Sequence, residues 1–192
     1  MKNTALKSII FFFILQTILN CDNKKQDWNE TNFDSKLSQN DSIKLMNELY
    51  DPMEFYDDSI SGNKKTSFVI YDNDYNKNIC KVQIKHDTLV INIGYSSGFS
   101  SGGFTILYAN KKYKVQPYYG TDNIAIFVDE KGKEIKPAPP KHFFKNSKLI
   151  LDKPNYKKND SIYGFIDFSS LEINNNKKTN HKGRGYFKAK IQ

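Results

Sequence analysis

The residues best suited to chemistry do not complete a known metal-binding pattern. Residues 72–76, Asp-Asn-Asp-Tyr-Asn, place oxygen side chains at alternate positions, as the start of an EF-hand calcium loop does. However, Lys77 stands where that loop needs glycine, and Gln83 stands where it needs a bidentate glutamate. We therefore predict a turn between strands at 72–76 and no metal there.

The histidines and cysteines outside the N-terminus give no catalytic grouping either. His86, His142 and His181 lie in separate predicted loops, and none stands at ligand spacing from a cysteine, a glutamate or another histidine. Cys80 falls on the apolar side of a predicted strand, which indicates a buried structural thiol rather than a nucleophile. The sequence therefore predicts no cofactor and no catalytic residue, and it favours a non-catalytic protein.

The segment Gly94–Phe104, GYSSGFSSGGF, is the most unusual stretch of the chain. It lacks the Lys-Ser or Lys-Thr ending of a phosphate-binding loop. One interpretation is a flexible hairpin connection; the other is that small residues let Tyr95 and Phe99 project where binding loops usually sit. Tyr118 and Tyr119 could add neighbouring aromatic surface, although core packing explains them equally well. These four aromatic residues are the candidate ligand-binding residues.

The framework that must position these residues is predicted to be β-rich. Cys80, Val82 and Ile84 alternate with polar residues, which is the pattern of a strand with one buried face. Similar runs follow at 66–71, 88–95, 103–109, 111–117, 123–129, 148–153, 161–168 and 184–191. Short strands joined by tight turns predict an antiparallel β-sandwich or, alternatively, a partly open barrel. The polar segment 171–184 is expected to be a long mobile loop between the last two strands.

The chain before the strands divides into a tether and one helix. Ile43, Met46 and Leu49 fall at helical spacing behind Asp41 as a predicted N-cap, which indicates a helix over about 41–50. Residues 21–40 are polar without a sustained period and are expected to form a flexible tether. Residues 41–192 are then a single β-rich domain.

The N-terminus predicts export. Lys2 and Lys7 form a short basic region before an apolar run at 9–15, and this run is too short to span a bilayer. A basic start followed by an apolar run of this length is the layout of a secretory signal. Residues 18–21, Ile-Leu-Asn-Cys, resemble the lipobox of bacterial lipoproteins. The resemblance implies removal of 1–20, acylation of Cys21, and a domain anchored by lipid in the cell envelope, facing the periplasm or the cell surface. An ordinary signal peptide with an unrelated cysteine is the alternative.

The charge of the chain belongs to its folded part. Removing residues 1–20 takes away two lysines and no acid, so the formal net charge falls from +8 to +6. Arg184 is the only arginine, whereas proteins that read nucleic acids rely on arginine for phosphate and guanine contacts. We therefore expect no nucleic-acid partner. The lysines indicate either an ordinary solvated surface or attraction to anionic lipid or glycan.

Three classes of function are compatible with these features. The leading hypothesis is a non-catalytic binding or interaction module of the envelope, which predicts an aromatic-lined groove near residues 94–104. An envelope hydrolase would need carboxylates or histidines that meet only in the folded chain. An immunity-type protective lipoprotein would need a large protein-binding surface.

Overall fold

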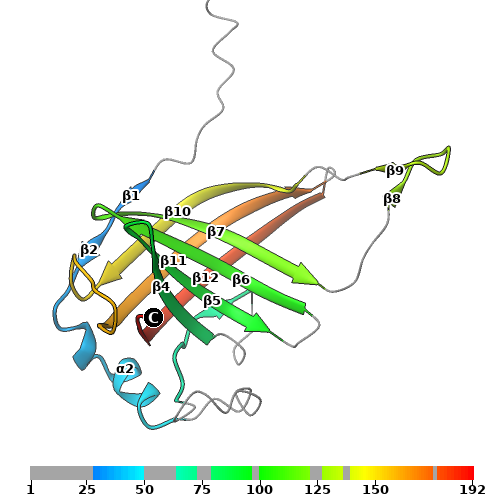
Figure 1. The fold of residues 1–192 in the computed structure, drawn as a ribbon. Coiled ribbons are helices and arrows are strands. Elements are labelled where there is room, and N and C mark those ends of the chain that lie inside the picture. The colour runs from blue at the N-terminus through cyan, green and yellow to red at the C-terminus, as the bar shows by residue number, and fades with distance from the viewer. Residues whose placement is uncertain are drawn as a thin grey trace, which may run out of the picture.

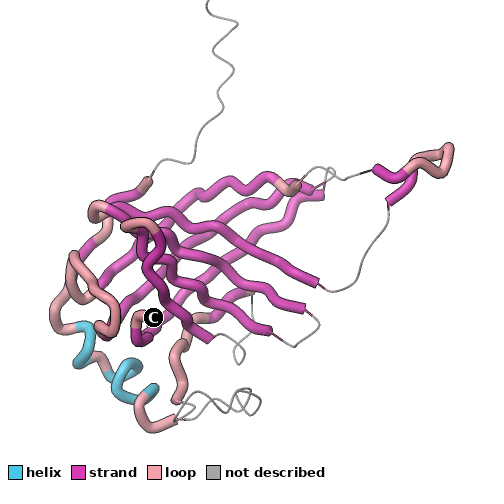
Figure 2. Tube along the Cα trace, in the orientation of Figure 1, coloured by secondary structure: helices cyan, strands magenta, loops and turns pink. Residues whose placement is uncertain are grey.

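Two five-stranded sheets lie face to face and form the body of the protein (Figures 1 and 2). The computed structural model describes residues 28–49, 64–72, 79–96, 100–121, 127–135, 139–174 and 177–192. Sheet A contains, in spatial order, β1 (Asn29–Glu30), β7 (Lys112–Thr121), β6 (Ser100–Ala109), β5 (Thr88–Ser96) and β4 (Ile79–Lys85). Sheet B contains β2 (Asn32–Phe33), β10 (Lys141–Leu151), β11 (Ser161–Asn174), β12 (Lys177–Lys190) and β3 (Ile70–Tyr71).

The pairing of these strands confirms the predicted antiparallel β-sandwich. Neighbouring strands are antiparallel except β2 and β10, which run parallel. The described strands divide into two sheets and form no closed barrel, and an isolated bridge joins Val82 of β4 to Ile191, which follows β12. A further hairpin, β8 (Phe127–Val128) with β9 (Glu134–Ile135), stands apart from both sheets (Figure 1). Among the described residues, no helix is long and apolar enough to cross a membrane.

The core lies between the sheets and follows the alternation that the sequence shows. Alternate residues in the middle of β4 to β7 and of β10 to β12 point inward, and most of these side chains are apolar and form one cluster. Its largest fully buried members are Phe104, Tyr113, Phe187, Ile91, Ile93, Ile106, Leu149, Leu151, Ile162 and Ile166. Cys80 is buried among them, and burial raises the pKa of its thiol, as expected for a structural cysteine.

The described part of the predicted tether is packed on the sandwich. Residues 29–33, expected within the tether over 21–40, add an edge strand to each sheet. Thr31 N–H donates to Lys111 O at 3.0 Å and Asp34 N–H donates to Leu151 O at 2.9 Å. Edge pairing needs only backbone hydrogen bonds, so it leaves no hydrophobic period in the sequence. Residues 21–27 lie outside the described part of the chain.

The α-helix in the described part of the chain ends earlier than the spacing of its apolar residues predicts. After a 3₁₀ turn, η1 (Leu37–Gln39), the helix α2 spans Asp41–Met46 instead of about 41–50. Its N-cap is Asn40, not Asp41, because the Asn40 Oδ1 accepts from Ser42 N–H at 3.0 Å. Ile43 and Met46 are fully buried, whereas Leu49 is exposed, so the buried stripe ends with the helix.

The expectation of a mobile loop at 171–184 is wrong. The ladder between β11 and β12 continues from Ser161 opposite Lys190 to Asn174 opposite Lys177. Polar residues occupy both faces here, so the alternation of apolar and polar residues that marks a strand is lost. The hydrogen-bonded ladder nevertheless continues, and it carries His181 on a strand instead of a loop.

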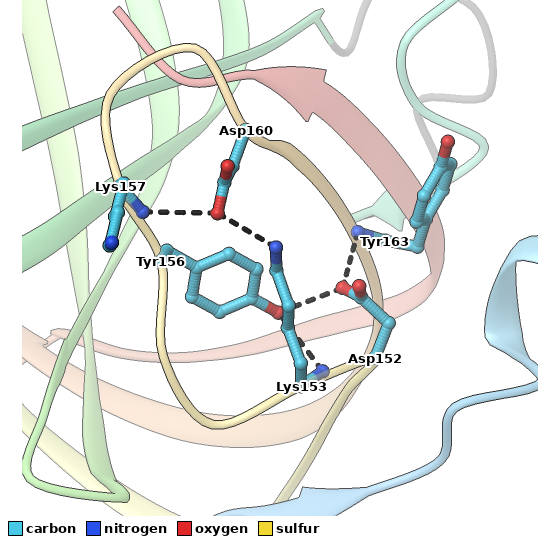
Figure 3. A network of polar contacts seen from close by, with 6 residues as sticks. All are labelled: Asp152, Lys153, Tyr156, Lys157, Asp160 and Tyr163. Carbon is cyan, nitrogen blue, oxygen red and sulfur yellow. Dashed lines mark hydrogen bonds and ion pairs between the residues drawn. The ribbon is translucent and has the colours of Figure 1, made fainter.

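The loop between β10 and β11 closes one end of the sandwich through polar contacts (Figure 3). Asp152 Oδ1 accepts from the Tyr156 hydroxyl at 2.8 Å and from Tyr163 N–H at 2.9 Å. The Lys153 ammonium donates to Asp160 at 2.7 Å. Tyr108 reaches this loop from sheet A and donates its hydroxyl to Pro154 O at 2.6 Å. The loop is thereby fixed to both sheets.

Candidate functional site

The glycines of the unusual segment make room for two tyrosines. In the register of sheet A, Gly94 lies opposite Gly103, which lies opposite Tyr118 on the next strand. A Cβ added to Gly94 would collide with the Tyr118 hydroxyl and with the backbone carbonyl of Gly102. A Cβ added to Gly102 would lie 3.0 Å from the Tyr95 ring. Gly103 has φ +151°, a conformation that residues with a side chain rarely adopt.

The segment is therefore strand on both sides, and the flexible interpretation does not apply to its described residues. Residues 94–96 end β5 and residues 100–104 begin β6. Residues 97–99, including the candidate Phe99, lie outside the described part of the chain.

Tyr95 and Tyr118 line one cavity of about 360 Å³ at this end of sheet A. The lining residues occupy outward positions of the strands, opposite to the buried core, except Tyr95, which is in phase with the buried Ile91 and Ile93. The described residues that line it are Ile79, Lys81, Asn92, Gly94, Tyr95, Ser101, Thr105 and Tyr118. Tyr119 does not line the cavity and is 73% exposed. The structure thus brings together two of the four predicted aromatic residues, and it places a third elsewhere.

The cavity offers donors and one positive charge. The Thr105 hydroxyl donates to Asn92 Oδ1 at 2.7 Å, which leaves the Asn92 amide nitrogen able to donate to a ligand. Burial, together with the nearby Tyr95, raises the pKa of Tyr118, so its phenol stays neutral and can also donate. Lys81 is the only charged residue among those that line the cavity. This set suits a polar ligand that carries hydroxyl groups or negative charge.

A second polar group lies between the sheets at the same end and was not predicted. We call Asp72, His142, Glu172 and His181 the acid–histidine cluster. His181 Nε2 lies 3.0 Å from Glu172 Oε2, and its Nδ1 makes a short hydrogen bond with Asp72 Oδ2. His142 Nε2 lies 4.0 Å from the same Glu172 oxygen. The Tyr71 ring stacks on His181 with centroids 6.0 Å apart.

The two imidazoles of this cluster titrate in opposite directions. Burial alone would lower the pKa of His181, but the hydrogen bonds and charges of Asp72 and Glu172 raise it overall. Burial lowers the pKa of His142, and the neighbouring His181 lowers it further against the pull of Glu172. His181 is thus the imidazole that holds a proton, because both ring nitrogens can then donate to carboxylates.

Two buried polar atoms beside the cluster lack a hydrogen-bond partner within the described residues. They are His142 Nδ1 and Ser170 Oγ, and Ser170 is only 2% exposed. Ser170 lies directly opposite His181 across the β11–β12 ladder. Across the described ranges, no three His, Cys, Asp or Glu side chains are arranged to hold a metal ion.

The cluster was missed because its histidines are far apart in sequence. The expected loop at 171–184 hid the alternation that puts Glu172 and His181 on one face of one hairpin. His142 joins them because β10 runs beside β11, where it lies opposite Glu172. The usable signal would have been the hairpin register: residue 181 pairs with residue 170, and residue 172 lies two positions further along the same strand, so 172 and 181 share a face.

The candidate lipidation residue Cys21 lies outside the described residues. Comparisons of the chain with protein-family models, with curated proteins and with solved structures gave no significant match.

Proposed function

We propose that the protein is a lipid-anchored binding module of the bacterial cell envelope, without catalytic activity. The observation that carries the proposal is the cavity lined by Tyr95 and Tyr118. An aromatic-lined site near residues 94–104 is what the binding hypothesis requires. Cavities of this size on a rigid sheet, with a few convergent polar groups, are typical ligand sites.

The composition of the cavity favours a small anionic saccharide, of one or two sugar rings. Aromatic rings can pack on the apolar face of a sugar, and their hydroxyls stay available for hydrogen bonds. Asn92, Ser101 and Thr105 can hydrogen-bond ligand hydroxyls, and Lys81 can pair with a carboxylate or phosphate. None of the described residues that line the cavity is an acid, so none of them repels an anion.

A ligand screen tests this assignment. The full-length protein in detergent is heated with neutral sugars and with sugars that carry a carboxylate or a phosphate. We expect a rise in melting temperature with an anionic sugar, because a ligand that binds only the folded state stabilises it. The rise should be lost in Tyr118→Ala and kept in Tyr119→Ala, the exposed neighbour. No shift with any sugar would refute the ligand class.

The membrane anchor is tested separately. Cys21→Ser should move the protein from the membrane fraction to the soluble fraction, because acyl chains contribute about 0.8 kcal/mol per buried methylene. An unchanged membrane fraction for this variant would contradict acylation of Cys21.

A hydrolase is the second candidate, and the acid–histidine cluster is the observation that favours it. Two carboxylates and two imidazoles meet there from four strands or strand ends, as the hydrolase hypothesis requires. The described lining of the Tyr118 cavity contains none of these four residues, and binding is preferred because that cavity has the predicted aromatic residues. Hydrolysis of nitrophenyl esters or glycosides that is abolished by Glu172→Gln and unaffected by Tyr118→Ala would reverse this preference.

A further inference from the structure

The outward face of sheet B carries a groove that the proposed function does not use. Its volume is about 570 Å³, and it lies between the sheet and the segment that runs from Asp34 to Asn40. Residues from that segment line one side: Asp34, Lys36, Leu37, Gln39 and Asn40. Residues from three strands form the floor: Lys148, Ile150, Phe165, Asp167, Arg184 and Tyr186. The groove is therefore long enough to touch β10, β11 and β12 together.

The floor of the groove is an aromatic and aliphatic row. Ile150, Phe165 and Tyr186 lie opposite one another in the register of the three strands. The rings of Phe165 and Tyr186 have centroids 4.9 Å apart and planes inclined by 56°. All three side chains are half-buried on the face that points away from the core. The buried Leu37 of η1 covers one side of this row, and the rest of the row faces the groove.

The rim of the groove is basic. Lys36, Lys148 and Arg184 outnumber the carboxylates Asp34 and Asp167. Arg184 Nε pairs with Asp167 at 3.6 Å, but the Arg184 side chain is 73% exposed and its other guanidinium N–H groups can donate to a ligand.

Beyond the groove, the basic character continues along the outward side of β12. Lys178, Lys182 and Lys190 occupy alternate outward positions in phase with Arg184 and are exposed. The Lys188 ammonium, in the same row, instead donates to Oδ1 of Asn47, the C-cap residue of α2. A row of this kind offers a positive charge at multiples of about 7 Å along the strand.

We infer that this groove binds an acidic polysaccharide chain. A row of apolar side chains suits the faces of consecutive sugar rings, and the basic rim complements acidic groups along the chain. Asp34 and Asp167 can accept hydrogen bonds from sugar hydroxyls that lie between the acidic groups of such a chain. A concave floor also suits a chain better than a flat bilayer. The site lies on the sheet opposite the Tyr118 cavity and takes a longer ligand, so it is independent of the proposed function.

Charge reversal in the groove tests the inference. The probes are long oligogalacturonate, heparin-derived oligosaccharide, a neutral malto-oligosaccharide and phosphatidylglycerol vesicles, each titrated into the full-length protein in detergent or reconstituted. We expect at least one acidic oligosaccharide to bind and the neutral one to bind much more weakly. Lys148→Glu with Arg184→Glu should weaken binding about tenfold or more, and added salt should weaken it in the wild type.

Matched variants separate this site from general charge and from the Tyr118 cavity. Lys85→Glu with Lys131→Glu changes the net charge equally at exposed residues outside the groove and should leave the affinity within about twofold of wild type. Tyr118→Ala should also leave it unchanged. Equal losses in both charge pairs, no binding of either acidic oligosaccharide, or vesicle binding that depends on Lys148 and Arg184 would each overturn the inference.

Discussion

Replacement of Gly94 by alanine should strain the end of sheet A, because no space exists there for one more carbon. The added Cβ would collide with the Gly102 carbonyl oxygen, which belongs to the neighbouring strand, and with the Tyr118 hydroxyl. Overpacking of this kind costs about 1–3 kcal/mol, and the upper half applies because a backbone atom must move. For a chain of this size, a loss of about 2–3 kcal/mol in the free energy of unfolding lowers the melting temperature by about 4–12 °C.

Gly120→Ala is the matched control for this prediction. Gly120 lies on β7, two residues after Tyr118, and its added Cβ would meet only the Ser101 hydroxyl at 2.9 Å. A side-chain tip can rotate away, and alanine also restricts the unfolded chain, so the change should stay within about 1 kcal/mol. Thermal unfolding followed by circular dichroism measures both variants. Equal melting temperatures for Gly94→Ala and Gly120→Ala would refute the claim that the glycine-rich segment is a packed pair of strands.

Three further predictions follow from other parts of the fold. Deletion of residues 187–192 removes the fully buried Phe187 and the nearly fully buried Ile191. Because loss of one buried aromatic side chain alone costs about 3–5 kcal/mol, the cooperative thermal transition should disappear. An unchanged transition would contradict the packing of the C-terminal strand. Because the pKa of His181 is raised in the folded state, its contribution is complete below the unfolded pKa of about 6.5 and is lost as pH rises through the folded value. His181→Gln should therefore lower the melting temperature more at pH 6 than at pH 9, and the opposite order would show that the carboxylates do not hold the proton. Tyr156→Phe removes the hydroxyl that donates to Asp152 and should cost about 1–2 kcal/mol in chemical denaturation, whereas no loss would show that the loop in Figure 3 is held by other contacts.

The sequence predicted the strands that have one buried and one exposed face. Cys80 and Val82 alternate with polar residues, and both are buried between the sheets. Projection of Tyr95 was one of two interpretations of the small residues between 94 and 104, and Tyr95 lines the cavity together with Tyr118.

The sequence could not predict features that depend on backbone pairing or on contacts between distant residues. Edge strands at 29–33 use backbone hydrogen bonds that any polar residue can make. The acid–histidine cluster needs the register of β10, β11 and β12, which brings His142 opposite Glu172. Residue type alone could not separate Tyr119 from Tyr118: the two are adjacent in sequence, but only Tyr118 is among the described residues that line the cavity.

The most direct test of the central claim is the affinity of one anionic sugar for three proteins. Isothermal titration would compare wild type, Tyr118→Ala and Tyr119→Ala with the sugar that gives the largest thermal shift. Removing a ring that packs on the ligand and donates a hydrogen bond should cost about 2–3 kcal/mol, or about 30-fold to 150-fold in affinity. The account predicts this loss for Tyr118→Ala and a change within about twofold for Tyr119→Ala. Equal affinities for all three proteins would contradict the assignment of the cavity as the binding site.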